Sequence, residues 1–489
     1  MAPKVSRIPT PGKGPQAAIP SPAAEKCIAL YKDYYRHQLA LSPDDEQAMF
    51  AALARPLPVT FRLVGALSEG FPAEEVTQLD AQLAASLRST HGASQEEGER
   101  AVQAPVDSDE MSVTNLEWYP HGAAWQLNVP KKRLKESRGL QAFLLREVAV
   151  GTLVRMEMVS MIPAIALGVL PGDLVLDLCA APGSKTGQLL EMVVPSRALQ
   201  GAAAGDSARY GAVVANDPDI KRGRMMIHRA KALCSPSLIV TALPGQSFPV
   251  LHFDGAPLLF DRVLCDVPCS GDGTVRKSHY LLHKWHPAHA LQLHILQVAL
   301  LRRSAEVTRE GGNLVYSTCS LNPVENEAVV AAVVAAAGGA LEICSPEAVQ
   351  RFRSRPGLTS WQIPDMNVEG VFYPTYDEVP ETKPEKAASR GRERFSRRGL
   401  QRSMFPPEDA SMGLEKCMRV LPQDQDTGGF FVALLRKVGP VHFPSASSSL
   451  AHDDAPALSD PASDPVSDPV SDPASDAPGD SDAPGGGGG

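Results

Sequence analysis

The chain has 489 residues, of which 43% are hydrophobic and 21% charged, as in an ordinary globular protein with room for two domains. Its formal net charge is −9, but residues 441–489 alone hold nine Asp and no Lys, Arg or Glu, and the rest of the chain carries 47 acidic and 47 basic residues. This balance argues against a protein that binds nucleic acid through its overall charge, and it leaves room for a local basic surface.

Eight cysteines are spread along the chain without a CxxC pair, which favours free thiols in a reducing compartment over a disulfide framework or a zinc site. The N-terminus shows no apolar signal core. The longest apolar run, 328–341, is too short to cross a bilayer and predicts a buried helix and turn. We therefore expect a soluble protein inside the cell that binds neither a metal ion nor a membrane.

The first 165 residues predict a disordered arm and a small domain. Residues 1–24 are Pro-rich and basic and show no periodic pattern, so we expect them to be disordered. The next segment, 25–165, is expected to form a small α+β domain. Its evidence is a helical pattern at 25–53, a strand-like run at 55–63, a polar stretch at 67–110 and a helical pattern at 139–170.

The segment 166–437 predicts a larger α/β domain, because short apolar runs typical of buried strands alternate with helical stretches. The predicted strands are 174–178, 212–216, 237–241, 260–265, 313–318 and 430–435, and the predicted helices are 219–233, 289–309 and 324–336. This alternation predicts a parallel sheet covered by helices on both faces, with the last strand closing the sheet.

Three segments have the composition of insertions or tails. An Ala/Gly-rich stretch at 196–211 and an Arg-rich stretch at 381–402 interrupt the larger domain. The tail at 438–489 repeats Ser-Asp-Pro and ends in five glycines, so it cannot bury enough apolar surface to fold.

A turn rich in small residues follows the first predicted strand of the larger domain. It runs from Asp177 to Thr186 as Asp-Leu-Cys-Ala-Ala-Pro-Gly-Ser-Lys-Thr, and Asp217 follows the next strand. In doubly wound sheets ligands bind at the carboxyl ends of strands, where an acid can accept both ribose hydroxyls of a nucleoside. The spacing is not that of a phosphate-binding loop, so an adenosine-bearing cofactor such as S-adenosylmethionine suits it better. Taken alone, a loop with so few glycines favours a simple tight turn, with Asp217 as a helix N-cap, over a cofactor site.

Two cysteines, Cys269 and Cys319, follow predicted strands and so share one edge of the sheet with this turn. A single cysteine is usually a small buried hydrophobe, but two at strand ends beside Gly, Ser or Pro indicate chemistry. A thiolate that adds to carbon 6 of cytosine makes carbon 5 nucleophilic toward a sulfonium methyl group, and a second group is then needed for release. Asp266 is placed to hydrogen-bond the base, and Lys185 to lower a thiol pKa or orient the base. The base must be unstacked to enter such a pocket.

Three motifs together resemble the NSUN-type (Sun/RsmB-like) RNA cytosine-C5 methyltransferases over about residues 31–437. They are the turn at 177–186, Asp266-Val-Pro-Cys-Ser-Gly271 and Tyr316-Ser-Thr-Cys-Ser-Leu-Asn-Pro323. Further matches, such as Trp118-Tyr-Pro and Met404-Phe-Pro-Pro407, are similar to the eukaryotic tRNA-acting branch. The resemblance implies a Rossmann-like class I methyltransferase sheet, with the smaller N-terminal domain docking RNA.

The resemblance also implies roles for individual residues. Cys319 is the expected nucleophile and Cys269 the group that assists product release, with Asp266 and Lys185 completing the catalytic set. The expected cofactor contacts are Cys179, Ala180, Ala181, Pro182, Gly183, Ser184, Lys185, Asp217 and Asp266, and Arg222 matches a basic residue of the next helix. One departure is Pro244, which stands where the family commonly has an acid that contacts adenine. A second is the acidic tail, in place of a long C-terminal extension.

Candidate RNA contacts are less specific. The arginines between 390 and 402 suit a phosphate-binding strip, a solvated insertion or a nuclear-import signal equally well. Tyr31, Tyr34 and Tyr35 could stack on bases, although their helical spacing favours a place in the core. The segment with His279, His283, Trp285 and His286 is a candidate flap over the substrate.

We therefore expect a monomeric tRNA methyltransferase of the nucleus or nucleolus, with the cytoplasm as the alternative location. Ribosomal or messenger RNA is the alternative substrate, and DNA is disfavoured because the second cysteine has no counterpart in that chemistry. A protein of another class, an RNA-binding scaffold with weakened catalysis, is supported only by Pro244.

Overall fold

The computed structural model describes residues 22–68, 70–92, 111–135, 137–194, 211–233, 235–366, 368, 370–381, 397 and 400–443. Residues 22–24 of the predicted arm already belong to a helix, so the arm was predicted three residues too long. The rest of the arm, nearly all of both predicted insertions, and the tail beyond residue 443 lie outside the described residues.

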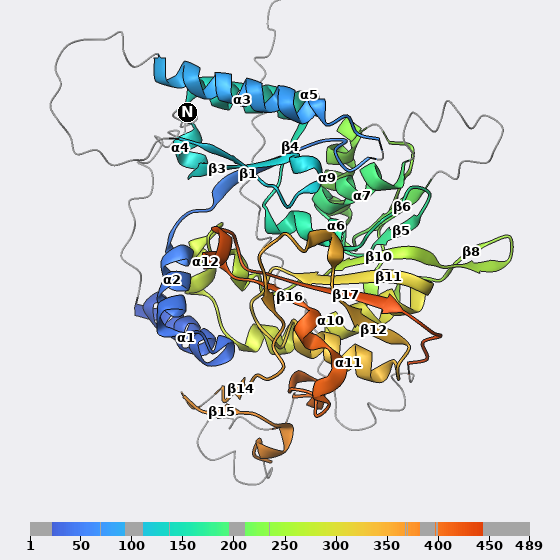
Figure 1. Cartoon of the computed structure of the whole chain (residues 1–489). Coiled ribbons are helices and arrows are strands. Elements are labelled where there is room, and N and C mark those ends of the chain that lie inside the picture. Colours follow the sequence, from blue (N-terminus) through green and yellow to red (C-terminus); the bar gives the residue numbers. More distant parts are fainter. Residues whose placement is uncertain are drawn as a thin grey trace, which may run out of the picture. The chain divides into compact units, whose positions relative to one another are not determined.

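A sheet forms the centre of the larger domain, as predicted, but it is mixed where a parallel sheet was expected (Figure 1). Its parallel strands are β5 (Leu174–Asp177), β6 (Ala212–Asn216), β7 (Leu238–Thr241), β10 (Phe260–Asp266) and β11 (Thr308–Thr318). Its antiparallel part is β12 (Leu341–Cys344), β13 (Arg355–Pro356), β16 (Met418–Val420) and β17 (Phe430–Lys437). The order is β13-β16-β17-β11-β10-β5-β6-β7, with β12 also paired to β17. The last strand, β17, therefore lies inside the sheet and does not close it.

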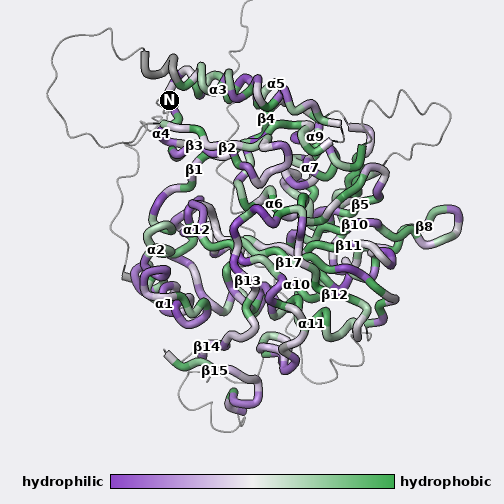
Figure 2. Tube along the Cα trace, in the orientation of Figure 1, coloured by the Kyte–Doolittle hydropathy of each residue, from purple (hydrophilic) through white to green (hydrophobic). Residues whose placement is uncertain are grey.

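Helices cover both faces of this sheet because successive strand residues point to opposite sides. Val263 and Leu314 belong to the hydrophobic cluster that contains residues of α10 (Ala288–Val307) and α11 (Glu327–Ala336). The next residues, Leu264 and Val315, belong to the cluster that contains residues of α6 (Ile162–Ala166) and α7 (Ser184–Val193). Figure 2 shows hydrophobic residues along β5, β10 and β11. None of the described helices is long and apolar enough to span a membrane.

The predicted small domain contains a four-stranded antiparallel sheet. Its order is β2-β3-β1-β4, from Val113–Asn115, Ala124–Pro130, Pro58–Leu63 and Leu153–Arg155. Two helices, α3 (Glu74–Gly92) and α5 (Arg138–Val150), lie side by side and contribute to the same core. The prediction of helix throughout 139–170 was wrong at β4, because pairing with β1 overrides the local pattern there. The polar stretch at 67–110 contains α3, which the sequence pattern did not predict.

The first two helices pack against the larger domain. Helix α1 (Pro22–Leu39) and helix α2 (Pro43–Ala54) share a core cluster with residues that follow both cysteines. Its buried members are Tyr31, Tyr34, Tyr35, Leu39, Met49, Leu53, Val275, Trp285, Leu321 and Leu421. The three tyrosines are thus core residues, as their spacing favoured, and they are not free to stack on RNA. The predicted single domain over 25–165 is corrected accordingly: its first helices belong structurally with the larger domain.

Replacing Trp285 by Ala should strongly destabilise this junction. Trp285 is 4% exposed, contacts all three tyrosine rings at centroid distances of 5.1–5.8 Å, and donates to Asp272 over 3.2 Å. Truncation of a buried aromatic residue costs about 3–5 kcal/mol. We expect that loss in the free energy of unfolding, measured by urea denaturation. Exposed Tyr280, 58% accessible, provides the control, because Tyr280→Ala should change stability by less than about 1 kcal/mol.

Candidate active site

The candidate site lies at the point where the order of strands along the sheet reverses. From β5 the chain proceeds through β6 to β7 on one side, and it later crosses to β10 and β11 on the other. Open α/β sheets bind ligands at the carboxyl ends of strands next to such a reversal. Here the small-residue turn follows β5 and Asp266 ends β10, so the predicted cofactor turn and the predicted base-binding acid flank the same point.

The structure brings the two predicted cysteines together. The sulfur of Cys269, beyond β10, lies 3.3 Å from the sulfur of Cys319, beyond β11. The loops are also joined by a hydrogen bond from the Gly273 N–H to the Cys319 carbonyl, at 3.0 Å. The hydrogen bond to Cys319, together with burial, raises the pKa of the Cys269 thiol well above its ordinary value. Cys269 therefore stays protonated and can donate this hydrogen bond.

Lys185 and Asp266 form an ion pair beside the thiols. The Lys185 ammonium lies 2.6 Å from Asp266 Oδ2, and the Ser317 hydroxyl donates to Asp266 Oδ1 at 2.6 Å. The Lys185 ammonium also lies 5.5 Å from the centre of the Phe430 ring. The positive charge of Lys185 thus stabilises and orients the Asp266 carboxylate. Of its two expected roles, orientation of the base through this acid fits the geometry better than a direct effect on a thiol pKa.

Two buried carboxyl groups beneath the cysteine loops were not predicted. Glu325 accepts hydrogen bonds from Ser270 and Ser320, and Asp272 accepts from Tyr35 and Trp285. Burial and the nearby Asp272 raise the pKa of Glu325 to about 7. The sequence contained a signal for both acids. Asp272 follows Cys269 and Glu325 follows Cys319, each in a polar stretch that contains Gly or Asn, whereas a stretch that only filled the core would be apolar.

Asp272 also connects the loops to helix α1. Its Oδ1 accepts from the Leu321 N–H at 2.8 Å, and its backbone carbonyl accepts from the Tyr31 hydroxyl at 3.2 Å. The Tyr34 hydroxyl donates to Asn322 at 2.9 Å. Helix α1 thus braces the Cys319 loop as well as the Cys269 loop.

The cofactor end of the site is built around Asp217. Arg222 of helix α9 (Ile220–Ala230) lies 3.1 Å from the Asp217 carboxylate and donates to the Ala181 carbonyl at 2.8 Å. Burial raises the pKa of Asp217, and the charge of Arg222 opposes that rise. Ile220, three residues on, is 62% exposed. Asp217 can accept hydrogen bonds from ribose hydroxyls, and the exposed side chain of Ile220 can contact a flat base. The pair therefore fits a nucleoside such as that of S-adenosylmethionine.

The turn itself requires Gly183 at the start of α7. Gly183 has φ +96°, and a Cβ there would lie 2.8 Å from Cγ of Met226 on helix α9. Pro244, where an acid was expected, is exposed at the start of a single 3₁₀ turn, Gly245–Ser247. The residues present therefore fit the ribose of the cofactor, and they offer no carboxylate at position 244 for the adenine.

The stability of the protein should fall with rising pH because of Asp177. Burial raises the pKa of this acid from 3.8 to about 7, although the Thr186 hydroxyl donates to it at 2.7 Å. Since the folded pKa lies above the unfolded one, the favourable contribution is complete below about pH 4 and disappears as pH rises through 7. We expect a loss on the order of 2–4 kcal/mol between pH 4 and 8. Urea denaturation of Asp177→Asn should give a shallower slope, and parallel curves for the two proteins would contradict this.

The candidate RNA-contacting groups have mixed outcomes. Arg397 donates to Glu381 at 2.7 Å and Arg402 donates to Asp377 at 2.8 Å, which favours a solvated insertion for these two arginines. The arginines at 390–394 and 398 lie outside the described residues. His279–His283 form a 3₁₀ helix that contacts α1, and Trp285 is buried in the core beside it, so a role of this segment as a flap over the substrate stays a prediction. Within the described part of the chain, no cluster of three His, Cys, Asp or Glu side chains is arranged to hold a metal ion.

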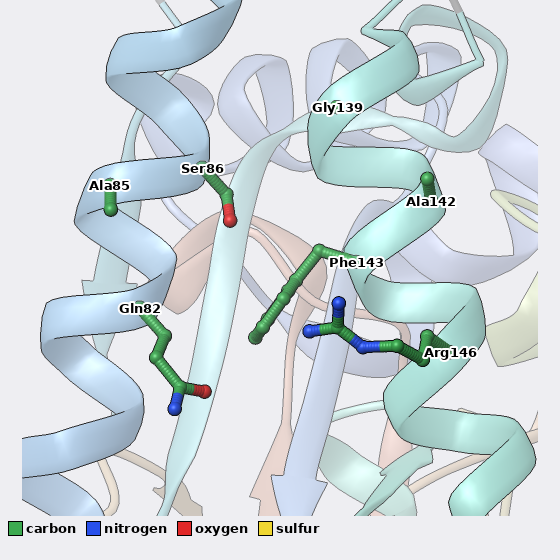
Figure 3. Close-up of a pocket in the computed structure, with 7 residues that line it drawn as sticks. All are labelled: Gln82, Ala85, Ser86, Gly139, Ala142, Phe143 and Arg146. Atoms are coloured by element: carbon green, nitrogen blue, oxygen red, sulfur yellow. The ribbon is translucent and has the colours of Figure 1, made fainter.

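A shallow groove of about 590 Å³ lies apart from this site, between α3 and α5. Figure 3 shows Gln82 and Ser86 of α3 facing Phe143 and Arg146 of α5. It belongs to the N-terminal domain and contains none of the predicted site residues.

The fold is that of the class I methyltransferases, and two thiols lie at the centre of the candidate site. A methyltransferase homolog protein from Pyrococcus horikoshii has the same fold, with a TM-score of 0.52 and 21% identity over 85% of this chain and 99% of that one. The family model of the 16S rRNA methyltransferases RsmB/F matches residues 164–377, the segment that holds both cysteines and the cofactor turn. This segment is similar to that family, as the motifs implied.

Eukaryotic relatives match over most of the chain. A tRNA (cytosine(34)-C(5))-methyltransferase of Drosophila melanogaster is 40% identical over 87% of this chain and 55% of its own length. A multisite-specific tRNA:(cytosine-C(5))-methyltransferase of Saccharomyces cerevisiae is 38% identical over 83% of this chain and 55% of its own length. The similarity to the tRNA-acting branch is thereby confirmed. The chain spans about half the length of these relatives.

Proposed function

We propose that this protein transfers a methyl group to carbon 5 of cytosine in RNA, with tRNA as the main substrate. The observation that carries the proposal is the pair of sulfurs 3.3 Å apart at the ends of β10 and β11, beside the Lys185–Asp266 ion pair. The names of the eukaryotic relatives support tRNA as the substrate class.

Cys319 is the proposed nucleophile. Its thiolate forms a bond to carbon 6 of cytosine, and the electron pair of the ring double bond moves to carbon 5, which becomes nucleophilic. S-adenosylmethionine, held by the turn from Cys179 to Lys185 and by Asp217 and Asp266, would supply the methyl group. Loss of the methyl group would leave S-adenosylhomocysteine. Carbon 5 then gives its proton to solvent, the electron pair of that bond re-forms the double bond between carbons 5 and 6, and the bond between carbon 6 and the sulfur breaks to free Cys319.

Cys269 and Asp266 both act on the target cytosine. Cys269 carries its proton within hydrogen-bond distance of the attacking sulfur, so it lies where it can assist elimination of Cys319 from the product. Asp266, oriented by Lys185 and Ser317, accepts hydrogen bonds from the exocyclic amine of cytosine. Both cysteines and Asp266 are partly buried at the carboxyl ends of β10 and β11. The target base must therefore leave its stack to reach them.

The test is methyl transfer by the purified full chain from labelled S-adenosylmethionine to unmodified tRNA, rRNA and mRNA transcripts, followed by bisulfite sequencing. Label on cytosine carbon 5 of tRNA supports the proposal. Preference for rRNA or mRNA would replace the substrate class, and RNA binding without methyl transfer would favour the scaffold alternative. Monomeric state and nuclear residence are further proposals, tested by light scattering and by imaging of the tagged full chain.

A further inference from the structure

We propose that Glu325 is a positioning residue that ties the two cysteine loops together and so sets the approach of the Cys269 and Cys319 sulfurs. The proposal rests on the proposed function for its catalytic consequence, but its geometric claim stands on the contacts alone.

One carboxyl group bonds to the residues that directly follow both cysteines. Glu325 Oε1 accepts from the Ser270 backbone N–H at 2.8 Å, and Oε2 accepts from the Ser270 hydroxyl at 2.5 Å and the Ser320 hydroxyl at 2.7 Å. The two hydroxyl oxygens are themselves 3.3 Å apart. Glu325 therefore joins the loops one residue away from each sulfur.

The carboxyl group is held from a third direction by helix α10. Gln297 donates to Glu325 Oε1 at 3.1 Å and to the Pro268 carbonyl, just before Cys269, at 3.0 Å. Glu325 is fully buried, and a carboxylate can accept about four hydrogen bonds, which is the number it has here. Removal of this acceptor leaves buried donors on both loops without a partner, so the loops must shift to satisfy them.

The loops have a second connection that does not involve Glu325. Asp272 Oδ1 accepts from the Leu321 N–H at 2.8 Å, and Gly273 N–H donates to the Cys319 carbonyl at 3.0 Å. Asp272 is itself held by α1, through the hydroxyl groups of Tyr31 and Tyr35. We therefore expect Glu325 variants to fold, with the change confined to the immediate surroundings of the sulfurs.

The decisive experiment measures the closeness of the sulfurs without RNA or cofactor. Diamide, a diazene oxidant, takes two electrons and two protons from two thiols, which become a disulfide while the diazene becomes a hydrazine. The reaction requires the sulfurs to approach from 3.3 Å to about 2.05 Å. The rate of Cys269–Cys319 disulfide formation in the full chain is followed by alkylation and peptide mass spectrometry.

Glu325→Ala is expected to slow this oxidation by about tenfold or more, because a displacement of even 1 Å strongly lowers the effective concentration of two reacting groups. The matched control is Glu191→Ala, which also removes a buried carboxyl group, here on helix α7. That carboxyl accepts from two groups of the N-terminal domain, Arg62 at 2.7 Å and the Gly65 N–H at 2.9 Å. It should leave the oxidation rate unchanged. Should Glu325→Ala fail to fold, the double variant Ser270→Ala/Ser320→Ala keeps the carboxyl and should show the same slowing.

A folded Glu325→Ala, or the serine double variant, that oxidises at the wild-type rate overturns the proposal. In the methylation assay, Glu325→Ala should lower kcat with little change in KM for RNA, since RNA binding does not involve this buried group. If the wild-type chain shows no methyl transfer at all, the proposed function fails, while the thiol measurement still decides the role of Glu325.

Discussion

Replacement of Cys319 by Ala is expected to lower methyl transfer to RNA by about 10⁴-fold or more, because it removes the thiolate that forms the bond to carbon 6. The substitution removes the sulfur and leaves the conformation of the loop unchanged, because its backbone is fixed by the hydrogen bond from the Gly273 N–H to the carbonyl of residue 319. The loss should therefore appear in kcat and not in the affinity for RNA. Single-turnover methylation with labelled cofactor, together with an RNA-binding titration, measures the two separately.

The control is Cys344→Ala on β12, a partly exposed thiol on the far, antiparallel side of β17. It should retain wild-type turnover, which shows that the loss is specific to Cys319. Full activity in Cys319→Ala would remove this residue from the reaction and transfer the nucleophile's role to Cys269.

The parallel half of the fold could be predicted from sequence because buried parallel strands are continuous apolar runs. Residues 212–216 were predicted as a strand and form β6 with the same ends, and β5, β7 and β10 differ from prediction by one residue at an end. The three-residue strand β4 could not be predicted, since a strand of that length has no pattern of its own and exists only through its pairing with β1.

The meeting of the cysteines could also be predicted, because the carboxyl ends of neighbouring parallel strands lie at one edge of a sheet. The supports beneath them could not. Tyr35 and Asp272 are separated by 237 residues, and no local pattern shows that a tyrosine of the first helix donates to an acid beside a cysteine. The same holds for Glu325, whose partners come from three separate segments.

Buried polar groups explain why this site depends on long-range contacts. A carboxyl group in a low-dielectric interior is stable only if several donors surround it. Asp272 obtains its donors from α1 and from the Cys319 loop, so the N-terminal helices become part of the architecture of the active site. The expectation that residues 25–165 form a separate domain is therefore incomplete, because α1 bonds to both cysteine loops and α2 shares the same core cluster. That the rest of this segment docks RNA stays a prediction.

Replacement of Cys269 by Ala is expected to trap the protein on its substrate. Cys319 and the Lys185–Asp266 pair remain in place, so addition to carbon 6 and methyl transfer proceed, but elimination loses the thiol that lies 3.3 Å from the bonded sulfur. A protein–RNA adduct should then accumulate to a large fraction of the enzyme, visible as a slower band on a denaturing gel that disappears on treatment with ribonuclease. Multiple turnover should fall by about 10²-fold or more, as for loss of a general acid–base group.

The double variant Cys269→Ala/Cys319→Ala separates a covalent adduct from tight binding. It lacks the nucleophile, so the slower band should be absent even though the RNA-binding surface is the same as in the single variant. If Cys269→Ala forms no adduct and turns over at the wild-type rate, the release role is wrong, and the proximity of the sulfurs must serve another purpose. If the band persists in the double variant, the cross-link involves a third residue, and neither cysteine carries the bond to RNA.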